Sequence, residues 1–409
     1  MQNKEKVFQF KLSILLSMLF LTSCRPLFVL EQITPEQAPA DQENEITITG
    51  SGFTDDIQLS LEATGLKIPL GNIKIINETR LTATIPSSAP ADIYDLVATQ
   101  ETQTTTLPQA FTLLSGTLKI YFLDVDQGDA TLIITPENEV ILIDGGPARL
   151  DRKLSEAINT YTNAPVSLLI LSHHDADHLG GIVEYLSGED GTAGTGDDII
   201  PKKSLAPQDD RSCTSQTCHR YRTLLSYPLE RAYAGTTMEM SALSIDVVSA
   251  DGNLGDGPLA NELEENEKSV GVILKYAGRK ILIAGDLTGG GADSLDLETP
   301  LSVRTGAIDV LRVSHHGSIS STPESALTNW APQVSIISTG THNSYCHPHP
   351  DVIDRLMVES ESIWLTGDGP NPETCGHDLP LDSKLHRNQG DILVEIDADG
   401  TLRSQASVN

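Results

Sequence analysis

Alternating apolar and polar residues dominate the chain between Val29 and Leu114. Residues 46–53 (ITITGSGF) alternate and then break at glycines, and residues 81–86 (LTATIP) and 94–98 (YDLVA) repeat the pattern. A period of two predicts half-buried β-strands, and several short strands separated by turns predict a small β-sandwich. We find no grouping of catalytic residue types in this segment, so we expect a spacer or an adhesion module.

From Gly116 the pattern changes to strongly apolar runs that end in polar loops. These runs predict strands at residues 119–123, 131–134, 140–143, 166–171, 310–313 and 334–337. Residues 150–161 have the apolar spacing of an amphipathic helix, and residues 270–284 predict a hairpin around 277–279. Strands that alternate with helices predict stacked layers of helix and sheet.

Residues 187–235 interrupt this alternation. Gly188–Asp198 is rich in glycine and acid but lacks the ligand spacing of an EF-hand, so we expect a solvated loop rather than a calcium site. The remainder is locally basic and aromatic, with Arg220, Arg222 and Arg231 interleaved with Tyr221, Tyr227 and Tyr233. The three arginines are therefore candidates for contact with an anionic substrate.

The first 24 residues are typical of an export signal. Three lysines precede an apolar run at residues 12–21, and Leu21-Thr22-Ser23-Cys24 follows it. This arrangement resembles a bacterial lipobox, which implies a lipid on Cys24 and an exported lipoprotein anchored to a membrane of the cell envelope or to the cell surface. An ordinary secretory signal and a short membrane anchor are the alternatives, although the run is too short to span a bilayer comfortably.

Length and charge limit the remaining possibilities. A chain of 409 residues is long enough for two domains. Its 57 acidic and 27 basic side chains give a formal net charge of −30. Such a surface repels polyanions, so the charge counts against tight binding of long duplex DNA.

Four cysteines remain after Cys24, at positions 213, 218, 346 and 375. Export permits disulfides and an even number allows complete pairing, so we expect the pairs Cys213–Cys218 and Cys346–Cys375. Zinc binding is the alternative, but the spacing of Cys213 and Cys218 lacks the usual short-knuckle form.

The clearest chemistry lies at residues 173–178, which have the sequence HHDADH directly after an apolar strand and before the Leu179-Gly180-Gly181 start of a helix. A strand end projects side chains into a crevice, and a helix N-terminus holds the loop there. Charged groups crowded beside an apolar strand are costly unless they are paired or bound to metal. Four ligand-type side chains in six residues can serve two metal ions.

HHDADHLGG resembles the second metal motif of the metallo-β-lactamase superfamily, in the form with Asp at the third position that is similar to ComEC-type competence proteins. Further pieces follow in the order of the family: FLDVDQGDATLI (with Asp126 where the family usually has Gly), ILIDGG, ILIAGDL, LRVSHHGS and ISTGTHNSYCHPHP. The resemblance covers residues 116–409 apart from the insertion at 187–235 and the segment 367–387. It implies an α/β fold, the αββα metallo-β-lactamase sandwich.

The N-terminal segment 29–114 resembles an immunoglobulin-like IPT/TIG domain. The strings ITITGSGF, LTATIP, IYDLVAT and AFTLL carry this resemblance. It implies an all-β domain ahead of the hydrolase domain.

The resemblance also implies a ligand set and supporting roles. The implied metal ligands are His173, Asp175, Asp177, His178, Asp286 and His315, with Asp286 as the bridge between two divalent ions. Asp144 would orient the metal loop. His316 is a further ligand, a proton donor or a structural partner of its neighbour. Asn343 and His347 contact substrate or hold their loop. Together with Asp177, these three residues are the catalytic candidates. A further ligand histidine of many family members is missing, because the one histidine in its interval is His219 in the insertion. An oxygen-rich site fits manganese as well as zinc.

Three functions remain open. The first is a phosphodiesterase or nuclease acting on extracellular nucleotides or single-stranded nucleic acid, through a water molecule that loses a proton between two cations. The second is a hydrolase of a small ester, lactone or lactam in the envelope. The third is a surface binding protein with a vestigial metal site. The oligomeric state does not follow from the sequence.

Overall fold

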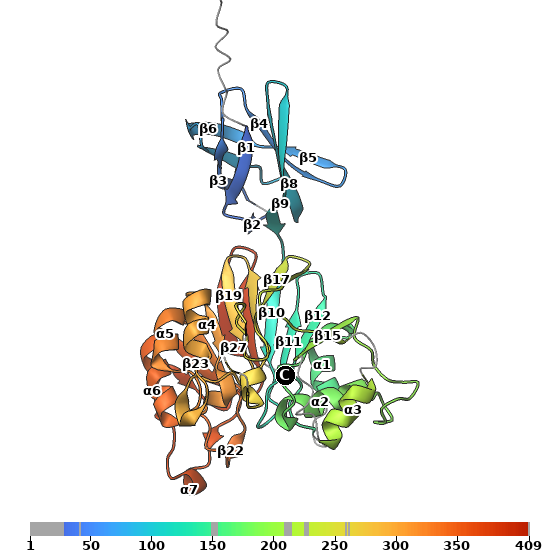
Figure 1. Ribbon diagram of the computed structural model, residues 1–409, viewed down its shortest axis with the longest axis vertical. Helices are drawn as coiled ribbons and strands as arrows, with labels where there is room; N and C mark the ends of the chain where they lie inside the picture. The colour runs from blue at the N-terminus through green and yellow to red at the C-terminus, as the bar shows by residue number, and fades with distance from the viewer. Residues whose placement is uncertain are drawn as a thin grey trace, which may run out of the picture.

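A computed structural model of the protein describes residues 28–40, 42–148, 154–207, 215–224, 229–257, 260 and 262–407. Figure 1 shows an all-strand part joined by a short connection to a larger part built of strands and helices. The predicted export signal, including Cys24, lies outside the described residues. Among the described residues, no helix is both long and apolar enough to cross a membrane.

The all-strand part consists of two sheets packed face to face. One sheet has the order β1 (Val29–Thr34), β3 (Asn44–Ser51), β7 (Arg80–Ile85), β6 (Gly71–Asn77). The other has the order β2 (Gln37–Pro39), β9 (Gln103–Leu114), β8 (Asp92–Gln100), β4 (Gln58–Ala63), β5 (Leu66–Pro69). Alternate residues of β3, such as Ile46 and Ile48, are buried between the sheets, as its period of two predicts.

The larger part contains two eight-stranded sheets. The first has the order β15 (Leu229–Arg231), β14 (Lys203–Ala206), β13 (Val166–Ile170), β12 (Val140–Ile143), β11 (Thr131–Ile134), β10 (Thr117–Phe122), β26 (Ile392–Asp397), β27 (Leu402–Ala406). The second has the order β16 (Thr237–Met240), β17 (Leu243–Ser249), β18 (Gly271–Tyr276), β19 (Arg279–Ile283), β20 (Val310–Arg312), β21 (Val334–Ile337), β23 (Ser362–Leu365), β25 (Leu385–His386). A small separate sheet pairs β22 (Thr341–Asn343) with β24 (Gly369–Pro370).

Helices cover the outer face of each sheet. Those on the first sheet are α1 (Leu154–Tyr161), α2 (Ala176–Leu186) and α3 (Gln216–Leu224). Those on the second are α4 (Glu298–Thr305), α5 (Glu324–Trp330) and α6 (Pro350–Glu359). The short elements are α7 (Pro372–Cys375), η1 (Asn266–Lys268), η2 (Gly291–Asp293) and η3 (Ser314–Gly317).

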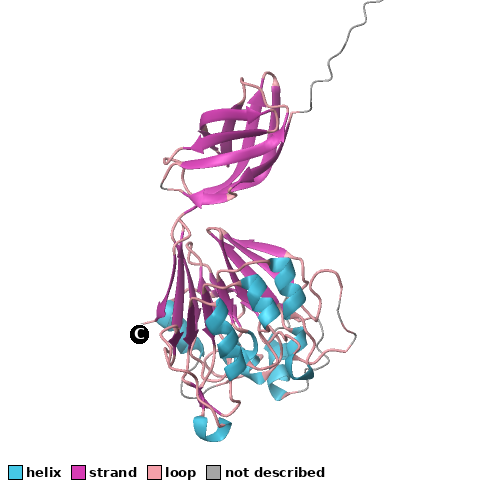
Figure 2. Ribbon diagram, turned by 90° about the vertical axis from the view of Figure 1, so that its left-hand side faces the viewer, coloured by secondary structure: helices cyan, strands magenta, loops and turns pink. Residues whose placement is uncertain are grey.

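Three apolar cores separate these four layers. One lies between the two sheets, one between the first sheet and α1–α3, and one between the second sheet and α4–α6. Figure 1 shows the strands between α4–α6 on one side and α1–α3 on the other, and Figure 2 shows that the helices drawn lie in the larger part. Strands such as β12 and β13 are buried throughout, because both of their faces are covered.

The connection between the two parts packs against the larger part. Leu114, the last residue of β9, is buried in the core between the two large sheets rather than in the sandwich. The Tyr276 hydroxyl donates to the carbonyl oxygens of Ser115 and Gly116, at 3.2 Å each. The packing unit of the larger part therefore includes the end of β9.

Candidate metal centre

The polar loops named above follow parallel strands that end at the same edge of the molecule. β12 pairs in parallel with β13, and β19 pairs in parallel with β20, which pairs in parallel with β21. Asp144, residues 172–178, Asp286 and the HHG turn of η3 come directly after β12, β13, β19 and β20. The topology thus brings together residues that lie more than 170 positions apart.

Glycines place the first loop against helix α2. A Cβ atom added to Gly181 would lie 2.0 Å from the Gly145 carbonyl oxygen, and one added to Gly180 would lie 2.4 Å from the Ala148 nitrogen. The Gly145 amide donates to the His178 carbonyl at 2.8 Å. The Leu179-Gly180-Gly181 and Asp144-Gly145-Gly146 sequences are therefore needed for close backbone packing, and this packing fixes His178.

Asp144 supports the loop at residues 172–178 through three hydrogen bonds. Its buried carboxylate accepts from the Ser172 amide (2.7 Å), the Ser172 hydroxyl (2.6 Å) and His178 Nδ1 (2.8 Å). The Ser172 hydroxyl oxygen in turn lies 2.9 Å from His173 Nδ1. Each Nδ1 proton has an acceptor, which leaves the Nε2 lone pair of a neutral imidazole free.

Three histidine rings lie close together, with ring centroids 4.2 Å apart for His173 and His178 and 5.4 Å apart for His178 and His316. The Nε2 atoms of His173, His178 and His316 are buried and make no hydrogen bond within the described part of the chain. His316 Nδ1 donates to the Ser338 carbonyl at 2.9 Å. Buried nitrogen atoms without a partner are costly, so this arrangement indicates a ligand that accepts their lone pairs.

Two carboxylates complete the group. Asp286 Oδ1 lies 3.3 Å from His178 Nε2, and Asp286 Oδ2 lies 3.5 Å from His316 Nε2. Asp177 Oδ2 lies 3.4 Å from His316 Nε2. Two overlapping sets result, one of His173, His178 and Asp286 and one of Asp177, His178 and His316.

The charges of this group perturb its members. Burial lowers the pKa of His178, but Asp286 and Asp144 outweigh burial and hold the pKa well above its ordinary value. Burial likewise opposes ionisation of Asp286, yet the positive charges of His178 and His316 hold its pKa well below the ordinary range. For His316, Asp286 and Asp177 overcome burial and raise the pKa to about 9. A cation must displace these protons, so a higher pH favours metal binding.

The two histidines of the HHG turn have different surroundings. The resemblance implies His315 as the ligand, but His315 Nδ1 lies 2.9 Å from the Ser320 hydroxyl, and its Nε2 lies 3.4 Å from Asn266 Nδ2 and 3.9 Å from Asp286. His316 is the member whose free Nε2 faces the carboxylates. Both histidines have left-handed backbone angles, φ 50° and 53°, and such strained residues concentrate at functional sites. Asp175 lies at the rim, with its half-exposed carboxylate 3.6 Å from His173 Nε2.

Asn343 and His347, which the sequence treats alike, have different surroundings in the structure. Asn343 Nδ2 donates to the Thr339 hydroxyl (3.0 Å) and the His347 carbonyl (2.6 Å), while its Oδ1 accepts from the His347 amide (3.1 Å). Asn343 therefore holds its loop. His347 lies in the site, with ring centroids 5.5 Å from His315 and 6.4 Å from His316. Burial lowers the pKa of His347, and these two histidines lower it further, to about 4. His347 is therefore neutral near pH 7 and has no extra proton to donate as a general acid at that pH.

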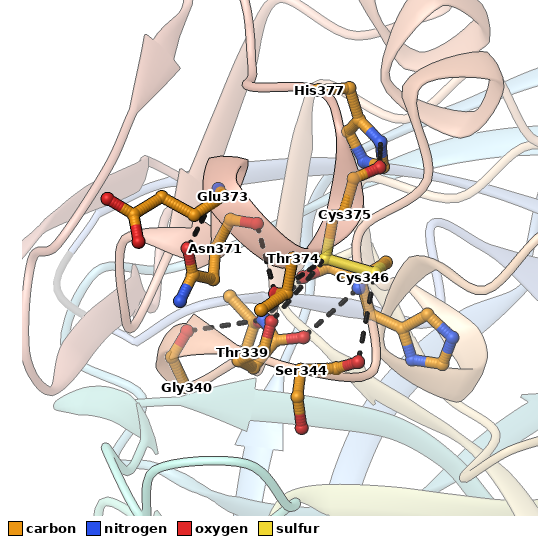
Figure 3. Close-up of a disulfide and its surroundings, with 11 residues drawn as sticks. Thr339, Gly340, Ser344, Cys346, Asn371, Glu373, Thr374, Cys375 and His377 are labelled. Carbon is orange, nitrogen blue, oxygen red and sulfur yellow. Dashed lines mark hydrogen bonds between the residues drawn. A yellow bond between two sulfur atoms is a disulfide. The ribbon is translucent and has the colours of Figure 1, made fainter.

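A disulfide links the His347 loop to α7, as expected. Cys346 and Cys375 are bonded, with Cα atoms 5.4 Å apart. Figure 3 shows this bond beside Ser344 and the Asn371–Cys375 turn. Asn371 caps α7 by accepting from the Glu373 amide at 2.9 Å. The segment 367–387, which departs from the family pattern, is thus fastened to the site. Cys213 lies outside the described residues, so its pairing with Cys218 stays a prediction.

The basic and aromatic residues that the structure describes in the insertion divide into buried or engaged side chains and exposed ones. Tyr221 is buried in the core under α3, and burial raises its pKa, so its ring is unavailable for stacking. Arg220 donates to the Ser187 hydroxyl (3.2 Å) and the Gly191 carbonyl (2.8 Å) and so fastens the acidic loop. Arg222 and Arg231 are exposed, and Tyr227 lies outside the described residues. An amphipathic pattern places Tyr221 on the inner face of a helix, a possibility that a count of residue types overlooks.

Comparison with known protein families agrees with this geometry. Residues 123–204, which include the HHDADH loop, match the metallo-beta-lactamase superfamily. The chain contains a metallo-beta-lactamase domain. Residues 29–113 match the IPT/TIG domain. The predicted fold class, an α/β metallo-β-lactamase fold behind an immunoglobulin-like all-β domain, is confirmed.

Curated relatives of the chain are competence and recombination proteins. The chain is 28% identical over 258 residues to Recombination protein 2 of Haemophilus influenzae and 25% identical over 270 residues to ComE operon protein 3 of Bacillus subtilis. It is 24% identical over 243 residues to Competence protein ComA of Neisseria gonorrhoeae. These alignments cover 62%, 62% and 59% of this chain but only 28%, 32% and 30% of the relatives. The chain spans about a third of their length.

The donor set of the metallo-beta-lactamase domain fits divalent cations. Imidazole nitrogen and carboxylate oxygen are ligands for both zinc and manganese. The free Nε2 atoms of His173, His178 and His316 lie close to the carboxylates of Asp177 and Asp286. This grouping of nitrogen and oxygen donors is the observation that supports a metal. His315, His347 and Asp175 surround this group.

A buried ion pair behind the metallo-beta-lactamase site was missed from the sequence. Arg312 Nε lies 2.8 Å from Asp129 Oδ2, and both side chains are fully buried. Arg312 also donates to the Gly285 carbonyl at 2.6 Å and lies 3.5 Å from Asp286 Oδ1. It therefore ties the opening motif to the Asp286 loop. A charged residue inside the apolar run Val-Leu-Arg-Val was the available signal, because isolated buried charges require partners.

Proposed function

We propose that the chain is an exported, metal-dependent phosphodiesterase that acts on nucleotides or on short or single-stranded nucleic acid. The convergence of three unpartnered histidine Nε2 atoms on Asp177 and Asp286 carries the proposal of a hydrolase. Relatives named for recombination and competence support a nucleic-acid substrate for this domain. A lipid on Cys24 is part of the proposal.

The cations, two of zinc or manganese in this proposal, would supply an acidified water molecule and a Lewis acid for the phosphoryl oxygen. His173, His178, His316, Asp177 and Asp286 would hold them. Asp144 and Ser172 keep the Nδ1 protons of His173 and His178 engaged, so both rings present Nε2. Ser338 does the same for His316. The chain's contribution is a rigid set of neutral nitrogen and ionised oxygen donors.

Charge decides between classes of nucleic acid. The formal charge of −30 disfavours long duplexes, whose binding depends on many phosphate contacts by basic side chains. The engagement of Arg220 with the acidic loop reduces the basic surface further. Short and single-stranded substrates depend less on such contacts.

Substrate screening tests the proposal directly. We expect the purified full chain to carry divalent metal by elemental analysis and to hydrolyse bis-p-nitrophenyl phosphate and single-stranded oligonucleotides. Chelation should abolish both activities, and nitrocefin should not be cleaved. Hydrolysis of nitrocefin or of a lactone without phosphodiesterase activity would favour the small-ester alternative. A chain that binds no metal and cleaves none of the substrates would indicate a vestigial site.

The IPT/TIG domain is expected to be dispensable for turnover. The sandwich has its own core, and the candidate ligands all lie in the larger part. A shortened chain beginning at Leu114, which keeps the residue that packs between the large sheets, should retain kcat on bis-p-nitrophenyl phosphate within about twofold. Circular dichroism would verify folding. A folded but inactive shortened chain would show that the sandwich helps to build the site.

A further inference from the structure

We propose that Tyr345 is a platform on which a nucleobase of the substrate stacks while its phosphodiester lies at the metal centre. This inference rests on the proposed function and adds a base subsite to it. Its starting observation is that Tyr345, whose ring lies beside that of His347, is 68% exposed.

The position of Tyr345 relates it to the site. Its ring centroid lies 6.4 Å from that of His347, whose ring lies 6.4 Å from that of His316. His316 Nε2 is 3.4 Å from Asp177, in the candidate metal group. The tyrosine thus lies two ring-to-ring steps from the reacting centre, and a sugar and base attached to a bound phosphate extend over a comparable distance.

The backbone on both sides of Tyr345 is held by hydrogen bonds and a disulfide. Asn343, two residues before Tyr345, bonds to both the amide and the carbonyl of His347, two residues after it. The next residue, Cys346, is bonded to Cys375 in the α7 turn, as Figure 3 shows. Cys346 has a left-handed φ of 63°, a conformation that persists where the surrounding structure determines it. A held backbone reduces the conformational entropy that is lost when a ligand stacks on the ring it carries.

Stacking also fits the unusual charge of the protein. A base–aromatic stack tolerates any sequence and does not require the positive groove that tracks a phosphate backbone. Among the described residues, Tyr233 is the other exposed tyrosine, at 54%. Tyr221, the buried member of the insertion, cannot serve. An acidic protein can therefore hold a nucleotide through its base at Tyr345.

The test compares substrates with and without a base. The full-length wild type and its variants would be assayed on thymidine p-nitrophenyl phosphate and on methyl p-nitrophenyl phosphate. The thymidine substrate would be whichever of the 5′ and 3′ isomers the wild type prefers. Tyr345→Ala should lower the ratio of the two kcat/KM values about tenfold, the effect expected for one stack. Tyr345→Phe keeps the ring and should keep the ratio. Leu381→Ala, at an exposed position of the disulfide-linked segment 367–387, is the surface control.

A binding measurement separates this inference from the proposed function. In EDTA, fluorescence anisotropy would compare labelled oligothymidylate with an abasic strand of equal length. We expect the wild type to bind the strand with bases more tightly than the abasic strand. In Tyr345→Ala the ratio of these two affinities should fall about tenfold. Loss of the preference in a chain that cleaves no phosphodiester would refute the proposed function and leave the platform standing. Equal ratios in wild type and Tyr345→Ala, or an effect of Tyr233→Ala instead, would overturn the platform.

Discussion

Replacing Asp286 with asparagine is expected to abolish hydrolysis and to reduce the bound metal. Its two carboxylate oxygens face His178 and His316 separately, at 3.3 and 3.5 Å, so under the proposed function this carboxylate would help to hold both cations. A neutral amide offers one oxygen and no charge to offset two dications. Under the proposed function the cations would supply several kcal/mol of charge stabilisation, and 1.36 kcal/mol is a factor of ten, so kcat/KM should fall on the order of a thousandfold.

The matched control for this substitution is Asp354→Asn, the same chemical change on the exposed face of α6. Elemental analysis should show reduced metal in Asp286→Asn and unchanged metal in Asp354→Asn. Circular dichroism and Tm would verify that both variants fold. Full activity and full metal content in Asp286→Asn would refute a bridging role for this carboxylate.

The second large effect concerns the two adjacent histidines. His316→Ala should lower bound metal and reduce kcat/KM by about a hundredfold or more, because it removes a free Nε2 that faces Asp177 and Asp286. His315→Ala should cost about tenfold or less, since both nitrogen atoms of His315 already lie beside Ser320 and Asn266. The two variants remove the same kind of ring from adjacent positions of η3, so each is the control for the other.

Metal content measured across a pH series adds an independent readout. Carboxylates hold the pKa of His316 near 9, so protons compete with cations at this ring below that pH. In the wild type, the apparent metal affinity should therefore rise as the pH increases toward 9. His316→Ala should flatten this dependence more than His315→Ala. A larger loss of metal in His315→Ala would mean that the turn exchanges its two rings when it binds a cation.

The sequence alone determined the fold class, most strand positions and the residue types of the site. The strands predicted at 131–134, 140–143 and 334–337 coincide with β11, β12 and β21. Continuous apolar runs are readable because a strand covered on both faces needs apolar side chains at every position. The HHDADH string is equally local, because ligands that serve one centre from one loop must be close in the chain. The Cys346–Cys375 pair followed from their number and the expected export, and it is confirmed.

Only the tertiary structure decided which of these side chains face one another. Two consecutive left-handed residues turn His316 inward and His315 toward Ser320, and adjacent letters in a sequence carry no information about that choice. The same holds for Arg312 and Asp129, which are paired across 183 positions, and for Tyr221, whose exposure depends on what α3 packs against. Residue types are set by local chemistry, whereas orientation and burial are set by contacts between distant strands. Long-range packing therefore selected the members of the candidate centre from a larger set that the sequence had offered.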